Sequence, residues 1–235
     1  MTDAQFLTVL KESFLTYLKT NPRSNEKLKV VHGAIAADLQ ARLGSEYKIR
    51  SLGYGNGKEA NIQGRYINKT VDITISRDNS PMAGIAVKFV MSNYLQNSNN
   101  YFENMLGETA NIRTGGFPYF QIFIIPSMLP YYKNGGKISK WEYITSHHVE
   151  KYLVLSRDNF EVLLHTPNKT LFYIIDIKGQ TPYDMAQTHD EYKRYFLENE
   201  FEIGLTPVDY QFGNAVICND YVTFAEKVTF TIKSI

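Results

Sequence analysis

The chain has 235 residues, of which 43% are hydrophobic, so it is long enough and apolar enough to bury an ordinary core. Its 25 Lys and Arg residues against 24 Asp and Glu residues give a formal net charge of +1, which excludes a global attraction to a polyanion and leaves nucleic-acid contacts to a local basic patch. The single cysteine, Cys218, excludes an internal disulfide and a cysteine-built zinc site.

No apolar run approaches the roughly 20 residues that a membrane span requires, and no repeat, low-complexity tract or long linker divides the chain. We therefore expect a cytoplasmic protein without membrane contact, in which residues 1–235 form one domain.

The N-terminal part predicts two helices followed by short strands. Apolar residues recur at three- and four-residue steps over residues 6–18, which predicts a first helix ended by Asn21-Pro22. A second helix has its apolar stripe over residues 28–43, and Gly44 ends it. The period then changes to two, and strands are predicted over residues 47–54, 61–67, 70–76 and 83–90.

A helix over residues 99–113 and a strand over 117–126, apolar almost throughout, follow these strands. The predicted order is therefore helix, three or four strands, helix and buried strand. In the remaining half the patterns predict helix over 139–156, strand over 170–179, helix over 189–201 and a closing strand pair over 222–235.

An acid and a lysine interrupt two neighbouring apolar strands. Asp72 lies in the strand 70–76 and Lys88 in the strand 83–90, and the polar turn between them predicts a hairpin. Alternation places Ala86 and Lys88 on the same face. Phosphodiester hydrolysis requires a divalent cation, for which Mg²⁺ prefers oxygen ligands, and a lysine nearby can orient the nucleophile or stabilise negative charge.

This arrangement resembles the PD-(D/E)XK nuclease superfamily, and most of all type II restriction endonucleases. Asp72 matches the first Asp of the motif, with Val71 in place of the Pro, and Lys88 matches the Lys. The resemblance covers residues 24–126. It implies an α/β fold with a restriction-endonuclease-like core, in which a mixed central sheet is flanked by helices. It further implies a homodimer that cleaves double-stranded DNA at a short specific sequence with Mg²⁺, and in which residues 127–235 supply recognition and subunit contacts.

Ala86 departs from the motif because it stands where the second acid is expected, and a methyl group cannot bind a metal. The metal ligands would then be Asp72 and the backbone carbonyl of Val87. Three explanations stay open: replacement of the acid gives an inactive protein that holds intact DNA, the acid has migrated to Glu103 or Glu108 on the following helix, or the protein is a naturally inactive DNA-binding protein.

Two further acids have alternative roles. Glu59 can hydrogen-bond to a metal ligand, bind a second metal ion, or be a solvated charge at a loop end. Glu26 can fill the helical acid position of the resembled nucleases, or simply complement the helix dipole. A more distant alternative is an unrelated interaction protein in which Asp72 and Lys88 form a structural ion pair.

Two segments are candidates for DNA contact. Amide side chains can contact phosphates or pair with adenine, and lysines among aromatic residues can grip phosphates, although a polar helix cap and a solvated loop would have the same composition. The candidates are Asn93, Asn97, Asn99 and Asn100 after the second strand of the hairpin, and Lys133, Lys137 and Lys140 after the buried strand. The five histidines show no zinc-site spacing, which favours packing or surface roles.

Overall fold

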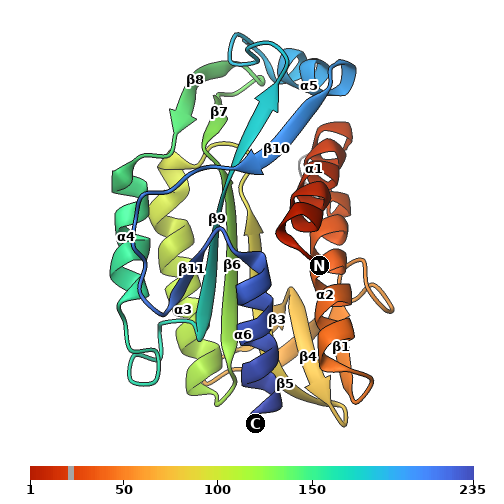
Figure 1. Ribbon diagram of the computed structural model, residues 1–235, viewed down its shortest axis with the longest axis vertical. Helices are drawn as coiled ribbons and strands as arrows, with labels where there is room; N and C mark the ends of the chain where they lie inside the picture. The colour runs from red at the N-terminus through yellow and green to blue at the C-terminus, as the bar shows by residue number, and fades with distance from the viewer. Residues whose placement is uncertain (21–23) are drawn as a thin grey trace.

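The computed structural model describes residues 1–20 and 24–235, and in it a mixed β-sheet lies between two groups of helices (Figure 1). Within these residues the sheet has seven strands, in the order β1-β4-β5-β6-β9-β10, with β11 beside β9. The strands are β1 (Tyr47–Ser51), β4 (Ile73–Arg77), β5 (Ser80–Phe89), β6 (Tyr119–Pro126), β9 (Lys169–Gly179), β10 (Phe201–Leu205) and β11 (Val216–Cys218). The predicted α/β class with a mixed sheet flanked by helices is confirmed.

The connection between β5 and β6 sets the middle of the sheet. β1, β4 and β5 are antiparallel neighbours, whereas β5, β6 and β9 are parallel. A parallel pair needs a crossover connection, which η1 (Leu95–Asn97) and α3 (Ser98–Thr114) provide. Every residue of β6 is buried, as its apolar sequence predicts for a strand covered on both faces. The predicted order of helix, strands, helix and buried strand is confirmed.

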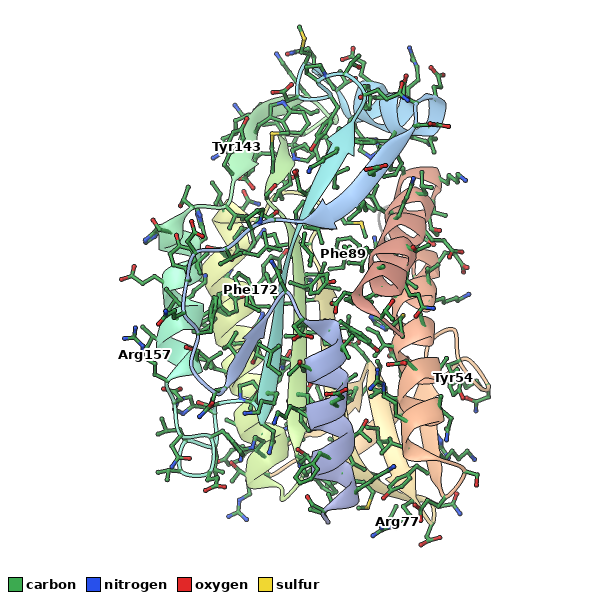
Figure 2. All side chains as sticks on the ribbon, viewed as in Figure 1. Tyr54, Arg77, Phe89, Tyr143, Arg157 and Phe172 are labelled. Atoms are coloured by element: carbon green, nitrogen blue, oxygen red, sulfur yellow. The ribbon has the colours of Figure 1, made fainter. Side chains whose placement is uncertain are left out.

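Different helices cover the two faces of the sheet (Figure 1). α1 (Asp3–Lys19), α2 (Glu26–Leu43) and α6 (Tyr221–Lys233) pack on one face, and α3 and α4 (Ser146–Ser156) on the other. Successive strand residues alternate between these two cores. Phe89, for example, lies in the first core and Phe172 in the second (Figure 2).

The remaining elements are small. β2 (Ala60–Gln63) pairs with β3 (Asn68–Val71), and β7 (Met128–Tyr132) pairs with β8 (Ile138–Tyr143). α5 (His189–Glu198) lies beyond the end of the sheet nearest to the β7–β8 hairpin (Figure 1). No helix in the described ranges has both the length and the hydropathy needed to cross a bilayer.

Several predicted elements need correction. The strand predicted over 61–67 ends at Gln63, and the one predicted over 70–76 is broken by a bend at Asp72. The helix predicted over 139–156 is helical only from Ser146, because its first residues form β8. The expected end of the first helix, Asn21-Pro22, lies outside the described residues.

The closing strand pair predicted over 222–235 is wrong, because this segment is the helix α6. Its buried residues are Tyr221, Phe224, Ala225, Val228 and Ile232. They recur at three- and four-residue steps, which is the helical period, and the Asp220 carboxylate caps the helix by accepting a hydrogen bond from the Thr223 N–H at 2.8 Å.

Candidate active site

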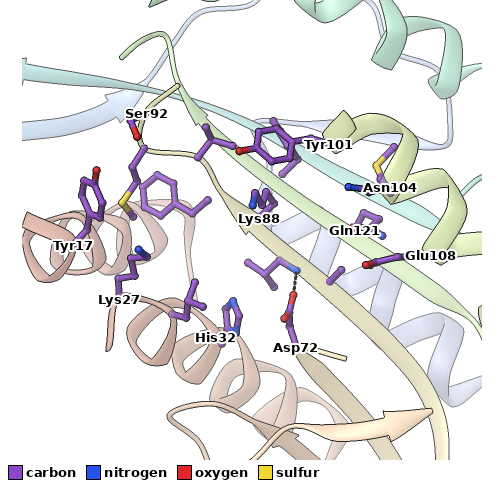
Figure 3. Close-up of a pocket in the computed structure, with 18 residues that line it drawn as sticks. Tyr17, Lys27, His32, Asp72, Lys88, Ser92, Tyr101, Asn104, Glu108 and Gln121 are labelled. Atoms are coloured by element: carbon purple, nitrogen blue, oxygen red, sulfur yellow. Dashed lines mark hydrogen bonds between the residues drawn. The ribbon is translucent and has the colours of Figure 1, made fainter. Parts of the chain in front are cut away.

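A cleft of about 570 Å³ lies along the edge of β5, with α2 on one side and α3 on the other (Figure 3). The cleft exists because β4 is shorter than β5. The pairing of the two strands ends with Ile73 opposite Ile85, and the chain bends away at Asp72. From Ala86 onward this part of β5 borders the cleft.

Asp72 takes over a hydrogen bond that the shortened strand would otherwise have made. Its carboxylate oxygen Oδ2 accepts from the Val87 backbone N–H at 2.7 Å, and its backbone carbonyl accepts from the Ser51 hydroxyl at 2.8 Å. These two contacts fix both the main chain and the side chain of Asp72. The N–H and C=O of one residue point to the same side of an antiparallel strand, so the Val87 carbonyl faces the same edge as Asp72.

Lys88 enters the same cleft from β5. Its ammonium lies 4.5 Å from the centre of the Tyr101 ring on α3. Burial lowers the pKa of Lys88, while the negative charges of Asp72 and Glu108 oppose that shift. The two strands form the predicted antiparallel hairpin. Asp72 and Lys88 are both described, and no direct ion pair joins them, so the structural ion-pair alternative has no support.

Position 86 lies on the α3 side of β5. Ala86 packs against the cluster that contains Ile112 of α3, and it stands opposite Gln121 of β6, whose side-chain nitrogen is buried without a hydrogen-bond partner. At position 86, where the motif expects an acid, the cleft therefore lacks a side-chain hydrogen-bond acceptor. Glu108, from α3, is an acidic candidate for that role, because it also lines the cleft.

The two proposed replacements for that acid have different environments. Glu108 forms an ion pair with Lys69 and accepts a hydrogen bond from the Tyr119 hydroxyl at 3.4 Å. Glu103 is exposed, and its charge acts on Lys151 outside the cleft. The structure thus brings Glu108 toward Lys88 and leaves Glu103 apart, so the expectation that Glu103 binds the metal has no support.

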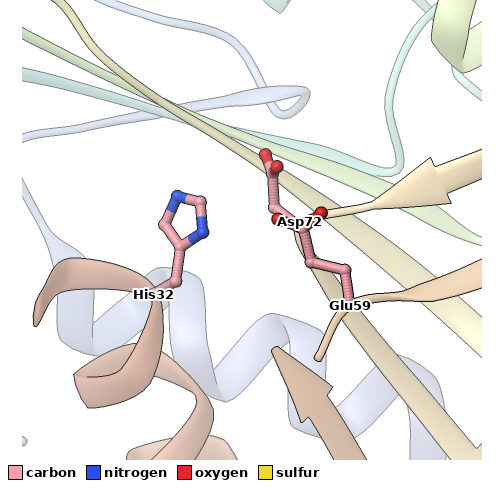
Figure 4. Close-up of side chains that lie close together, drawn as sticks. All are labelled: His32, Glu59 and Asp72. Carbon is pink, nitrogen blue, oxygen red and sulfur yellow. The ribbon is translucent and has the colours of Figure 1, made fainter. Parts of the chain in front are cut away.

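A second group of side chains lies on the α2 side of Asp72. His32, Glu59 and Asp72 offer ligand atoms that all lie within 4.8 Å of one another (Figure 4). His32 is only 1% exposed, and neither of its ring nitrogens has a hydrogen-bond partner. Burial lowers the pKa of His32, against the effect of Asp72. Burial and then the charge of Asp72 raise the pKa of Glu59. The three residues can bind a metal ion.

Two glycines bring these residues together. Gly53 has a φ of +72°, and a Cβ atom there would lie 2.1 Å from the Lys29 carbonyl oxygen of α2. A Cβ atom on Gly33 would lie 2.7 Å from the Gly53 carbonyl oxygen. Only glycine permits this approach of backbone to backbone. The loop therefore packs directly on α2 beside His32, and the chain then continues to Glu59.

The asparagines of the predicted DNA-contact segment are largely engaged within the protein. Asn93 donates to the Tyr132 carbonyl and accepts from the Tyr132 N–H, both at 2.9 Å, and so ties the end of β5 to β7. Asn97 donates to the Asn93 carbonyl at 3.3 Å, and Asn99 accepts from Lys151 at 3.3 Å. Asn100 is exposed. Asn93 and Asn97 therefore hold the loop between β5 and α3 in place, although the Asn97 side chain makes no capping hydrogen bond to α3.

The other predicted residues lie outside the cleft. Lys133 and Lys137 flank the exposed turn of the β7–β8 hairpin, and Lys140 lies 4.9 Å from the Tyr131 ring. Glu26 pairs with Lys29 at 2.6 Å and does not line the cleft.

Sequence reasoning missed two residues of the cleft, His32 and Lys27. Lys27 lines the wall formed by α2, and burial and the nearby charge of Lys88 lower its pKa. The signal for His32 was available: it follows Leu28 by four residues and therefore falls on the apolar face of the predicted helix. A polar ring in such a stripe needs a partner.

No family model, no curated protein and no solved structure matches this chain. The resemblance to PD-(D/E)XK nucleases therefore stays a proposal based on the residues of the cleft.

Proposed function

We propose that this protein is a PD-(D/E)XK nuclease of the type II restriction endonuclease kind, which acts on double-stranded DNA, and that Ala86 suppresses cleavage in this chain. The observation that carries the proposal is the placement of Asp72 and Lys88, from paired strands, in one open cleft between α2 and α3. The mixed sheet flanked by helices and the α3 crossover between β5 and β6 support the proposal of a restriction-endonuclease-like core.

On the side of Asp72 that faces Lys88, the Asp72 carboxylate and the Val87 carbonyl would hold the cation that the resemblance implies, Mg²⁺. Both are oxygen ligands, which suits Mg²⁺, but Ala86 adds none. A bound cation would lower the pKa of a water molecule and stabilise charge on the phosphate. The Lys88 ammonium would orient that water or stabilise the developing negative charge.

The cleft also offers positive charge to a phosphate. Lys27 and Lys88 line the cleft from α2 and β5, and burial together with the nearby charge of Lys88 lowers the pKa of Lys27. A DNA phosphate carries one negative charge, which both ammonium groups would attract. This pairing provides the local basic site that a chain with almost no net charge needs for DNA contact.

Ala86 supports a second candidate function, a DNA-binding protein of the same fold that does not cleave. With no carboxylate at position 86, the remaining oxygen ligands on this side are few. Glu108, which lines the cleft, could substitute for it, although its carboxylate already contacts Lys69 and Tyr119. Homodimerisation and sequence recognition by residues 127–235 complete the proposal and follow from the resemblance alone.

The test is a nicking and cleavage assay on phage DNA with Mg²⁺ or Mn²⁺, combined with gel retardation. Ala86→Glu should convert weak or absent cleavage into discrete fragments, whereas the matched variant Ala86→Gln, which adds similar bulk without charge, should not. DNA retardation without cleavage by Ala86→Glu would favour the second candidate. Cleavage by the unaltered chain that Glu108→Gln abolishes would assign the missing acid to Glu108. Absence of both DNA binding and cleavage would refute the proposal.

A further inference from the structure

His32 is a buried polar residue whose partner is missing from the protein itself. Its side chain is 1% exposed, and neither Nδ1 nor Nε2 has a hydrogen-bond partner. A neutral imidazole carries one donor and one acceptor, and buried polar atoms in folded proteins are nearly always satisfied. Figure 4 shows that the His32 ring faces the carboxylates of Glu59 and Asp72.

The spacing of the three side chains suits one ion. Metal–ligand bonds of the usual length, about 2.0–2.2 Å, place neighbouring ligand atoms about 3–4 Å apart. The ligand atoms of His32, Glu59 and Asp72 lie within 4.8 Å of one another, so small side-chain rotations would close the site. The three residues come from α2, from the segment before β2 and from the bend before β4, and the Gly53 contact with α2 holds the first two segments together.

We infer that His32, Glu59 and Asp72 form a metal site of their own on the α2 side of Asp72, and that this site selects ions of the Co²⁺ and Zn²⁺ class over Mg²⁺. Two carboxylates would match the charge of a dication. Mg²⁺ prefers an all-oxygen shell, whereas Co²⁺ and Zn²⁺ accept an imidazole nitrogen. With three protein ligands, the ion keeps positions open for water or for a phosphate oxygen.

This site differs from the Mg²⁺ site of the proposed function. Ala86 packs with residues on the α3 side of the sheet, whereas His32 comes from α2 on the other side, and Asp72 lines the same cleft as both. Asp72 can therefore contribute to both sites. The inference rests on the proposed function only for this shared residue, because metal binding is measured without DNA.

The experiment titrates Co²⁺ into the metal-stripped full-length chain, followed by calorimetry and by visible absorption, whose intensity reports the coordination geometry of the bound Co²⁺. We expect one tight site, with Mg²⁺ binding at least about 100-fold more weakly. His32→Leu, which has similar volume, and Glu59→Gln should each weaken Co²⁺ binding by about 100-fold or more, because even partners that only support a ligand cost 10–100-fold.

His147→Ala is the matched control, because His147 is an exposed histidine outside the cleft, and this variant should keep the tight site. Equal Co²⁺ affinity in the unaltered chain and in both His32→Leu and Glu59→Gln would overturn the inference, as would Mg²⁺ binding as tight as Co²⁺ binding. A chain that binds Co²⁺ through His32 but does not bind DNA would support the inference while refuting the proposed function. A chain that cleaves DNA with Mg²⁺ and binds no Co²⁺ would do the reverse.

Discussion

The unpaired His32 ring leads to a prediction about stability whose sign depends on metal. In metal-free buffer, His32→Leu should stabilise the protein, because leucine fills a similar volume without burying two unpaired nitrogens. An unpaired buried polar group costs about 1–3 kcal/mol in protein mutational data. We therefore expect the free energy of unfolding to rise by about 1–2 kcal/mol and the Tm by about 2–8 °C, since 1 kcal/mol corresponds to about 2–4 °C in a chain of this size.

Bound metal should make the unaltered chain more stable than His32→Leu. An ion that binds only the folded protein stabilises it by about 2.7 kcal/mol when its free concentration is about 100 times Kd. The unaltered chain should gain this amount from Co²⁺, whereas His32→Leu, which lacks a ligand, should gain little. The unaltered chain would then be the more stable of the two by about 1 kcal/mol.

The assay is thermal unfolding of both proteins in EDTA and in Co²⁺, with His147→Ala as a control that should follow the unaltered chain in both buffers. A lower Tm for His32→Leu in EDTA would mean that the imidazole makes favourable contacts in the metal-free protein, which contradicts the reasoning. An equal rise of Tm on adding Co²⁺ to both proteins would mean that the ion binds elsewhere.

Three further outcomes follow from contacts in and around the cleft. Lys27→Ala should weaken DNA retardation and reduce the slope of log K against log salt concentration by about one. Lys29→Ala, which removes an amine paired with Glu26 outside the cleft, should leave that slope unchanged. Equal slopes for the two variants would show that Lys27 does not contact DNA. Glu142→Ala should lower the free energy of unfolding by about 3 kcal/mol in urea titrations. The fully buried Glu142 carboxylate accepts hydrogen bonds from the N–H groups of Tyr94 at 2.7 Å and of Leu95 at 3.1 Å, and each lost partner costs about 1–3 kcal/mol. Glu142→Gln keeps an acceptor and should cost less, so an equal loss of stability in both variants would refute the role of these hydrogen bonds. Burial raises the pKa of Cys218 to about 11, so about one thiol in a thousand is ionised at pH 8. The rate of Cys218 alkylation should therefore be slow at pH 8 and should rise about tenfold per pH unit up to pH 10. An alkylation rate like that of a small free thiol would contradict this.

The parts of the fold that the sequence predicts well are those whose cause is local. The helix over residues 28–43 has an apolar stripe, and the strand over 117–126 is apolar almost throughout. Both patterns can be interpreted without a distant partner. The segment 222–235 was misread because its Val, Thr and Phe residues favour strands, whereas its buried positions repeat with the helical period. Here the spacing of apolar residues outweighs their individual propensities.

The candidate site was predictable only where it lies on one hairpin. Asp72 and Lys88 share a cleft because two adjacent strands pair, which their sequence indicates. The bend at Asp72 was not predictable, because it arises where β3 leaves to pair with β2 and β4 begins to pair with β5. The place of His32 on the apolar face of its helix follows from the local pattern, but its meeting with Glu59 depends on a backbone contact between Gly53 and α2, which no local pattern reveals.

The positions of Ala86 on the α3 side of the sheet and of His32 on α2 allow the two metal proposals to be separated. A carboxylate introduced by Ala86→Glu would enter on the α3 side, near Lys88 and Glu108, and would not contact the imidazole on the α2 side. If two sites exist, Ala86→Glu should raise Mg²⁺-dependent cleavage and leave the Co²⁺ thermal shift intact, whereas His32→Leu should remove that shift in either background. Loss of the Co²⁺ shift on Ala86→Glu alone would show that a single ion lies between Asp72 and position 86, and that His32 does not define a separate site.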